Sequence, residues 1–149
     1  MKTMQNWFDE YAESHQNPVN KAIHWVCIPL IFFSLVCLLL EVRPVADFSL
    51  ASMVMIAVLI YYFMLSRTIA LGMLMVYLLC LTGAKIWIIS FDIPLWQMAL
   101  TVFVLAWIGQ FIGHKIEGKK PSFLKDLQFL LIGPAWLLHF LFRKVGIPV

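Results

Sequence analysis

Long apolar segments separated by short polar ones dominate the chain. Four runs meet or approach the roughly 20 residues that a transmembrane helix needs. They are Trp25–Leu40, Phe48–Ser66, Ile69–Ser90 and Pro94–Gly113. A fifth run, Leu127–Phe142, is shorter and is interrupted by Gly133-Pro134, so it spans with a kink or lies partly in the interface. The pattern predicts an all-α, polytopic membrane helical bundle with four to five transmembrane helices.

The first 24 residues are more polar and indicate two helical pieces. Apolar side chains at i, i+3, i+4 and i+7 predict an amphipathic helix in the membrane interface within residues 1–16. These side chains are Met4, Trp7, Phe8 and Tyr11. Pro18 ends this helix, because the residue before a proline is disfavoured in the α region. A second helix can begin there, with Asn17 as N-cap and Pro18 in the first position, and run into the first span.

Composition strengthens the membrane interpretation. Of 149 residues, 62% are hydrophobic and 13% charged, and the 70 residues from Pro44 to Gly113 hold only four charged side chains. Average usage of about a quarter would give about 17. This composition excludes a soluble enzyme and a secreted disulfide scaffold. A nucleic-acid module is also excluded, since the net charge of +3 is not gathered into a basic stripe. The three cysteines lie in apolar runs and are expected to be buried small hydrophobes.

The distribution of Lys and Arg predicts the orientation. Most of these residues fall in the leader and in the 114–126 loop, which an even number of spans places on one side of the membrane. The positive-inside bias makes that side cytoplasmic, in a bacterial inner membrane or an endoplasmic reticulum membrane. We expect one integral membrane domain, 1–149, divided into an interfacial helix (1–16), four spans (17–113), a cytoplasmic loop (114–126) and a fifth, short or kinked span (127–142). The leader has no basic n-region or cleavage site and is expected to remain on the mature protein.

Two polar clusters lie at the cytoplasmic ends of the first and fourth spans. Asn17, Asn20 and His24 share one helix face with Lys21, and His15 lies across the preceding turn. The other cluster, Gln110, His114 and Glu117, follows an i, i+4, i+7 stripe. Gly109 and Gly113 form a small-xxx-small pair that lets a neighbouring helix approach closely. The topology therefore predicts that the two clusters meet at one membrane face.

Three histidines beside two Asn, a Gln and a Glu favour a metal or haem site over an inert polar cluster, since ionisable residues in spans usually mark function. Few carboxylates are available for a ferritin-like di-iron site. A mononuclear site with three or four histidines fits better, and it leaves positions for substrate and dioxygen, as non-haem Fe(II) oxygenases require. His139 is the candidate fourth ligand. Asn17, Asn20, Gln110 and Glu117 are expected to orient the imidazoles.

Other classes of protein remain open on the residues alone. A b-type haem held between His24 and His114 would make the chain a membrane electron carrier. Three histidines and a water are also a catalytic zinc pattern, which would suit a membrane lipid hydrolase. A non-catalytic transporter or assembly subunit has no support from an internal inverted repeat.

At these clusters the sequence resembles the membrane 2-hydroxy fatty acid dioxygenase family. The matching pieces are Tyr11-xxx-His15-x-Asn17-xx-Asn20-Lys21-xx-His24-xxx-Ile28-Pro29 and Gln110-xx-Gly113-His114-xx-Glu117-xxx-Pro121. The resemblance covers nearly the whole chain. Cys27 stands where the family usually has glycine and Ser122 where alanine is common, while His139 lies where many relatives carry an acidic residue.

The resemblance implies an Fe(II)-dependent α-oxidation of a 2-hydroxy long-chain fatty acid by O₂, as in phytosphingosine degradation, giving an odd-chain acid. The reaction R–CHOH–COOH + O₂ → R–COOH + CO₂ + H₂O balances without a reductant, and the chain has no glycine-rich phosphate loop. It further implies His15, His24 and His114 as ligands, with His139 as a fourth and Glu117 as a base or alternative oxygen ligand. The substrate tail would stay among the membrane helices; no nucleic acid is expected as a partner, and the oligomeric state is open.

Overall fold

The computed structural model describes residues 2–13, 15–45, 47–118 and 123–148, without the side chains of 123–128. Within these ranges it contains six helices and no strand. They are α1 (Met4–Ala12), α2 (Pro18–Leu40), α3 (Leu50–Leu65), α4 (Arg67–Ser90), α5 (Leu95–Glu117) and α6 (Phe123–Lys144). The predicted all-α fold is confirmed.

The start of α2 follows from local sequence. The Asn17 side chain accepts hydrogen bonds from the backbone N–H groups of Val19 and Asn20, at 2.9 and 3.4 Å, and Pro18 occupies the first helical position. A proline costs nothing there, because its missing N–H has no partner in the first turn of a helix. The predicted helix start is confirmed.

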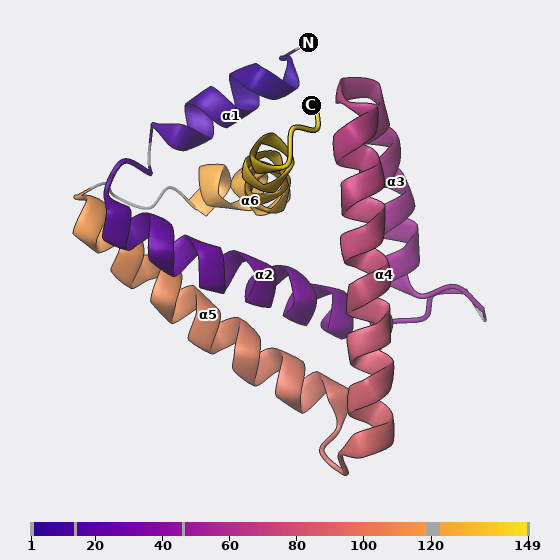
Figure 1. The fold of residues 1–149 in the computed structure, drawn as a ribbon. Coiled ribbons are helices and arrows are strands. Elements are labelled where there is room, and N and C mark those ends of the chain that lie inside the picture. Colours follow the sequence, from indigo (N-terminus) through magenta and orange to yellow (C-terminus); the bar gives the residue numbers. More distant parts are fainter. Residues whose placement is uncertain (1, 14, 46, 119–122, 149) are drawn as a thin grey trace.

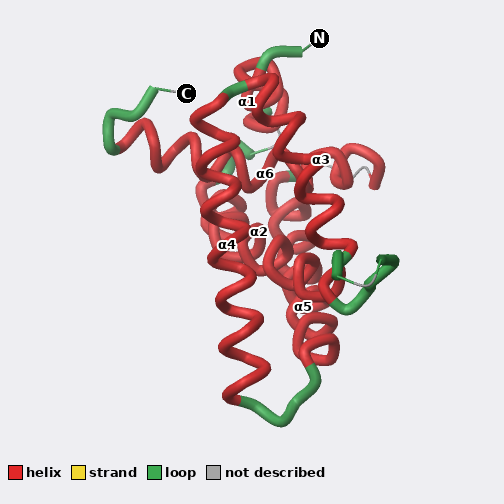
Figure 2. The backbone as a smooth tube through the Cα atoms, turned by 90° about the vertical axis from the view of Figure 1, so that its right-hand side faces the viewer, coloured by secondary structure: helices red, strands yellow, loops and turns green. Residues whose placement is uncertain are grey.

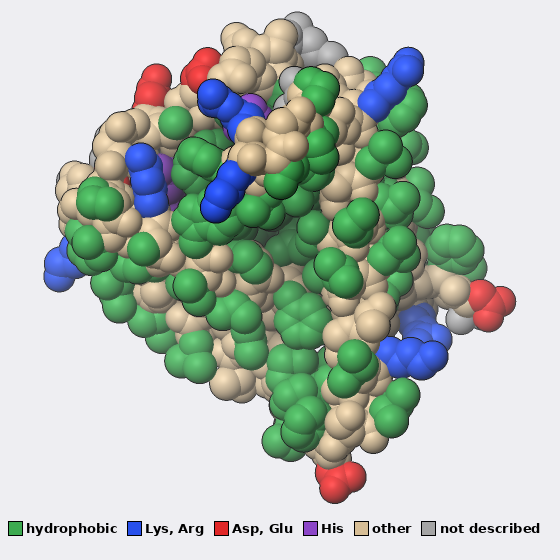
Figure 3. Space-filling view, viewed as in Figure 1, with side chains coloured by type: hydrophobic (Ala, Val, Ile, Leu, Met, Phe, Trp, Pro, Cys, Tyr) green, Lys and Arg blue, Asp and Glu red, His purple; other side chains and the backbone are tan. Residues whose placement is uncertain are grey.

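Three of the helices in the described ranges, α2, α4 and α5, are long and apolar enough to cross a membrane, and α3 is apolar but has only 16 residues. The predicted membrane helical bundle is confirmed by this character, and the count of four to five spans stays a prediction. Figure 3 shows hydrophobic side chains over the middle of the molecule and charged ones toward its ends. A surface of this kind suits contact with lipid.

Two helix pairs form the frame of the fold. Figure 1 shows α2 and α5 side by side and antiparallel. It also shows α3 packed against α4, next to the C-terminal end of α2 and the N-terminal end of α5; Figure 2 shows the same frame from the side. Glycines let α2 and α5 come close. A Cβ atom on Gly109 would lie 2.6 Å from Cys27 Sγ, and one on Gly113 would overlap the side-chain oxygen of Asn20. The predicted small-residue contact is confirmed.

The apolar face of α1 is covered by α6. The ring of Tyr11 lies 5.1 Å from that of Trp136 and 5.0 Å from that of Phe129, centroid to centroid. Met4, Phe8 and Tyr11 are buried. The amphipathic pattern predicted the helix, but its expected partner was the membrane interface, and aromatic side chains of α6 take that place.

Two predicted boundaries also differ. The 114–126 loop is shorter than predicted, because α5 continues to Glu117 and α6 begins at Phe123. The fifth helix, predicted over 127–142, extends beyond both limits and continues through Gly133-Pro134. The proline is tolerated inside the helix because neighbouring helices support the backbone around it.

Candidate metal centre

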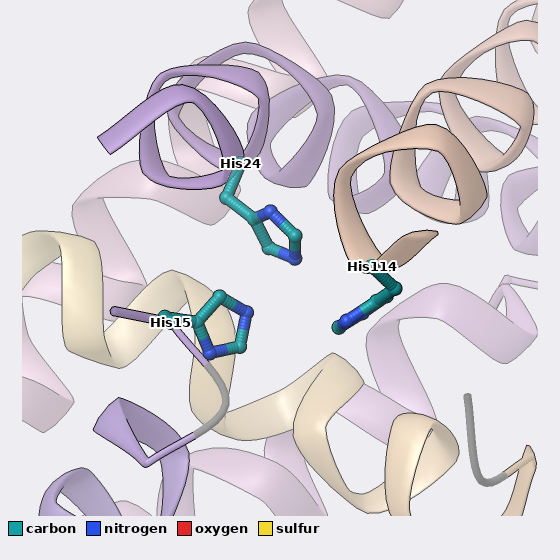
Figure 4. A group of neighbouring side chains, drawn as sticks. All are labelled: His15, His24 and His114. Atoms are coloured by element: carbon teal, nitrogen blue, oxygen red, sulfur yellow. The ribbon is translucent and has the colours of Figure 1, made fainter. Parts of the chain in front are cut away.

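Three histidines from three parts of the chain meet at one end of the α2–α5 pair. His15 lies in the linker between α1 and α2, His24 on α2 and His114 near the end of α5. One nitrogen of each ring lies within 4.8 Å of the corresponding nitrogens of the other two. His15 and His24 are buried and His114 is half-buried. Figure 4 shows the three rings turned toward a common point.

Backbone carbonyl groups orient two of these rings. The Nδ1–H of His15 donates to the carbonyl oxygen of Tyr11 at 2.6 Å, and the Nδ1–H of His24 donates to that of Asn20 at 2.9 Å. Each bond runs to the residue four positions earlier. With the proton held on Nδ1, the lone pair is on Nε2, and this arrangement is typical of metal-binding histidines.

Glu117 joins the last turn of α5 to the linker that carries His15. Its Oε1 accepts a hydrogen bond from the backbone N–H of Gln16 at 2.8 Å, and its Oε2 accepts one from that of Asn17 at 2.9 Å. The linker is thus tied to α5 on the His114 side of the cluster. Its position, and that of His15 with it, depends on this carboxylate.

Asn20 has a central place among these residues. Its side-chain Nδ2 donates to Glu117 Oε2 at 2.9 Å, and its backbone carbonyl accepts the bond from His24. The residue is fully buried, and its side-chain oxygen faces Gly113. Asn20 therefore couples the orientation of His24 to the position of the carboxylate.

A small cavity of about 40 Å³ lies beside the three imidazoles. Tyr11, Trp107 and Gln110 also line it. Among the described residues, the buried side-chain oxygen of Gln110 and the buried indole Nε1 of Trp107 have no hydrogen-bond partner. Buried polar atoms of this kind are uncommon and call for a ligand or water. Two residues that line the cavity thus carry one buried donor and one buried acceptor without a partner.

Trp107 was missed in the sequence. It lies three residues before Gln110 and seven before His114, on the same helical stripe, and this spacing was the available signal. A tryptophan in an apolar run is more often a membrane-interface anchor, so its type alone did not point to the site.

His139 does not join the other three histidines. It lies on α6 with its ring against Phe8 of α1, at a centroid distance of 4.7 Å. Of the predicted site residues, Asn17, Asn20, Gln110 and Glu117 surround the three clustered imidazoles, and His139 lies apart from them.

The donor set fits a metal ion. Imidazole nitrogens suit Fe, Zn and Cu, and three of them leave further coordination positions open. The arrangement does not suit a haem, because the rings of His24 and His114 are 5.0 Å apart and the cavity beside them has no room for a porphyrin.

Comparisons with known proteins agree with this chemistry. The profile of the Mpo1-like family, described as 2-hydroxy-palmitic acid dioxygenase Mpo1-like, matches residues 1–145. The chain is 32% identical over 141 residues to the 2-hydroxy-palmitic acid dioxygenase MPO1 of Saccharomyces cerevisiae, covering 93% of this chain and 79% of the yeast protein. No solved structure is significantly similar.

Proposed function

The chain belongs to the Mpo1-like family of 2-hydroxy-palmitic acid dioxygenases, and on that premise we propose that it is an Fe(II)-dependent enzyme that shortens 2-hydroxy long-chain fatty acids by one carbon. The reaction is R–CHOH–COOH + O₂ → R–COOH + CO₂ + H₂O. It needs no reductant, because the oxidation of C1 and C2 of the substrate supplies all four electrons that O₂ takes up. The observation that carries the proposal is the cluster of three imidazoles from His15, His24 and His114.

These three histidines are the proposed ligands. When bound there, Fe(II) would supply a redox-active Lewis acid with positions open to the substrate and to O₂. The bonds from Nδ1 of His15 and His24 to backbone carbonyls hold the rings in the orientation that the ion requires. His139 remains a candidate fourth ligand only if α6 shifts, since its ring packs on Phe8.

Trp107 and Gln110 are proposed to bind the head of the substrate. The indole Nε1–H of Trp107 is a donor suited to the substrate carboxylate, and the side-chain oxygen of Gln110 is an acceptor suited to the 2-hydroxyl. Both atoms are buried at the cavity. A substrate that engages them satisfies two polar atoms whose burial otherwise costs about 1–3 kcal/mol each.

For Glu117 the structure favours a positioning role over the predicted roles of base or ligand. Both of its oxygens already accept hydrogen bonds, from the N–H groups of Gln16, Asn17 and Asn20. A carboxylate used in this way keeps the His15 linker in place. We therefore propose that it acts on the reaction through the position of His15.

The test of the reaction is direct. Purified protein is loaded with Fe(II) without oxygen, mixed with 2-hydroxyhexadecanoic acid and exposed to O₂; pentadecanoic acid and CO₂ are measured. We expect both products in equal amounts, with one O₂ consumed. Zinc-loaded protein is the control and is expected to be inactive. Product formation with zinc and without O₂ would overturn the proposal, and cleavage of lipid esters by that preparation would support a hydrolase.

We also propose that the metal centre lies at the cytoplasmic face, as the positive-inside bias predicts. Cysteines placed at the exposed positions Lys115 and Arg43 test this, since the predicted topology puts them on opposite sides. A membrane-impermeant thiol reagent applied to sealed right-side-out vesicles should label Arg43→Cys alone. Labelling of Lys115→Cys alone would reverse the orientation, and labelling of both would contradict the topology.

A further inference from the structure

Beyond the histidine cavity, side chains of α2, α4 and α6 line a second, apolar cavity that is partly open to the surface. We propose that it holds the acyl tail of the substrate, so that the acid lies with its head at the histidines and its chain between these helices. The inference rests on the proposed function and adds to it the place and the length selection of the hydrocarbon chain.

The histidine cavity is too small for the whole substrate. Its volume is about 40 Å³, and a single water needs about 10–15 Å³ on this measure. It therefore has room for about three water-sized groups, such as the carboxylate and hydroxyl beside an ion. A long hydrocarbon chain must leave this space, and the apolar surroundings decide where it goes.

The apolar cavity is larger and next to it. Its volume is about 150 Å³, and its walls include Trp25 and Phe32 of α2, Val76 of α4, and Leu138 and Leu141 of α6. This lining is almost wholly hydrocarbon and aromatic, which suits an unbranched acyl chain and excludes a charged head. The histidine cavity thus suits the polar head of the substrate, and the apolar cavity suits its hydrocarbon tail.

One side chain belongs to both cavities. Ile28 lines both the histidine cavity and the apolar cavity, so the two cavities adjoin at this residue. On the α6 side, a Cβ atom on Gly133 would lie 3.2 Å from Ile28 Cδ1 and 3.3 Å from the Tyr11 hydroxyl. The absence of a side chain at Gly133 leaves Ile28 space at this junction. An isoleucine can change rotamer and let a chain pass, whereas a backbone wall could not.

Two proline residues on facing helices add to this picture. Pro29 of α2 and Pro134 of α6 both line the apolar cavity. Neither has a backbone N–H, and their rings present only carbon atoms to the cavity. A hydrocarbon chain between them meets no unsatisfied donor from these positions.

The first experiment fills the cavity from α4. Val76→Trp is compared with Val104→Trp, the same change at an exposed position of α5. For each variant, kcat/KM is measured with 2-hydroxyhexadecanoic and 2-hydroxyoctanoic acids. We expect Val76→Trp to lower the ratio of long-chain to short-chain kcat/KM about tenfold or more, since the added ring occupies the space of several methylene groups. Val104→Trp should leave the ratio unchanged.

Equal loss for both acids, or no change for either, would overturn the placement of the tail while leaving the proposed function intact. Wild-type protein that processes neither acid would instead contradict the proposed function.

A second experiment needs neither activity nor folding of a variant. Fe(II)-loaded wild-type protein, kept without O₂ so that no turnover occurs, is irradiated with a 2-hydroxyhexadecanoic acid that carries a diazirine at the end of its chain, and the labelled peptides are sequenced. We expect label on the segments around Val76 and Leu141, and competition by unlabelled 2-hydroxyhexadecanoic acid. Label confined to α3 or to the outer face of α5, or label that does not compete, would overturn the inference.

Discussion

The pairs α2–α5 and α3–α4 are both built from apolar antiparallel helices, yet they treat buried polar groups differently. In the α3–α4 pair, the hydroxyls of Ser52 and Tyr77 bond to each other at 3.1 Å, and the Tyr62 hydroxyl donates to the Leu131 carbonyl. These hydroxyls thus have partners, one within the pair and one on α6. In the α2–α5 pair, Trp107 and Gln110 line a cavity, and each has a buried polar side-chain atom without a partner among the described residues.

This difference separates scaffold from site. Burying a polar group without a hydrogen bond costs free energy, so a fold tolerates it where a ligand can compensate. On the proposed function, the polar residues Ser52, Tyr62 and Tyr77 of α3–α4 serve cohesion of the helices, and Trp107 and Gln110 of α5 serve binding. Matched substitutions in the two pairs test this division.

The largest effect is expected from a ligand. His24→Ala should lower turnover by about 10³-fold or more and abolish stoichiometric iron binding, because a site of three imidazoles cannot lose one and keep the ion's geometry. The matched change in the other pair, Tyr77→Phe, should leave turnover and iron content near wild type. Iron and activity are measured on the same preparations. Full activity of His24→Ala would remove the metal hypothesis.

The close approach of the helices comes next. A Cβ atom on Gly113 would overlap the Asn20 side-chain oxygen, so Gly113→Ala displaces Asn20, which bonds Glu117 and orients His24. We expect turnover to fall about 100-fold, since displacements near 1 Å at a reacting site have effects of this size. In Gly83→Ala of α4 the new methyl group meets only the ring of Phe33. That variant should stay within about twofold of wild type; equal losses would refute the comparison.

Glu117 should have an intermediate effect. Glu117→Gln places an amide N–H against the N–H groups of Asn17 and Asn20, and we expect turnover and iron affinity to fall about 10- to 100-fold. The pH profile of the remaining activity should keep its shape. Loss of its acidic limb would instead identify Glu117 as a base. Glu41→Gln at the other end of α2 is the matched control and should have no effect.

Two tryptophans offer a sharper contrast. In α4 the indole N–H of Trp87 donates to the carbonyl of Ile93 at 3.0 Å, whereas that of Trp107 is the proposed donor to substrate. Trp107→Phe should raise KM about tenfold, equivalent to a hydrogen bond to a charged group of about 1.4 kcal/mol, with little change in melting temperature. Trp87→Phe should lower the melting temperature and leave KM unchanged. The opposite pattern would remove Trp107 from substrate binding.

The smallest effect on activity is expected for His139. Its ring packs on Phe8, outside the group of three, so His139→Ala should change turnover by less than about threefold and lower the melting temperature through the lost contact. A large loss of activity together with iron would restore it as a fourth ligand.

Local and periodic features of the site were predictable from the sequence. The Asn17 cap and the Pro18 start depend on neighbours within one turn, and the Gly109 and Gly113 contact depends on a spacing that any α-helix preserves. The meeting of His24 with His114 was predicted from the expected topology, because an even number of spans would return the chain to the same side of a membrane.

Contacts that depend on the rotation of a helix about its axis were not predictable. A helix that is apolar nearly all round carries no clear hydrophobic stripe, so periodicity indicates poorly which face of α5 turns inward. For this reason the place of Trp107 at the cavity emerged only with the structure. The burial of α1 against α6 and the separation of His139 from the other histidines depend on which helices pack together, and helix periodicity does not encode that. The bonds from the linker to Glu117 depend on a loop geometry that spacing does not encode.

The bonds from Gln16 and Asn17 to Glu117 join residues 101 and 100 positions apart. A ribosome has therefore released the first two histidines long before it makes the third. Until α5 has been inserted, His15 and His24 offer an ion only two of the three imidazoles, and the linker that carries His15 lacks its anchor. On the proposed function, binding of iron is thus a late event in biosynthesis, and a nascent chain stopped before α5 should leave the ribosome without the metal.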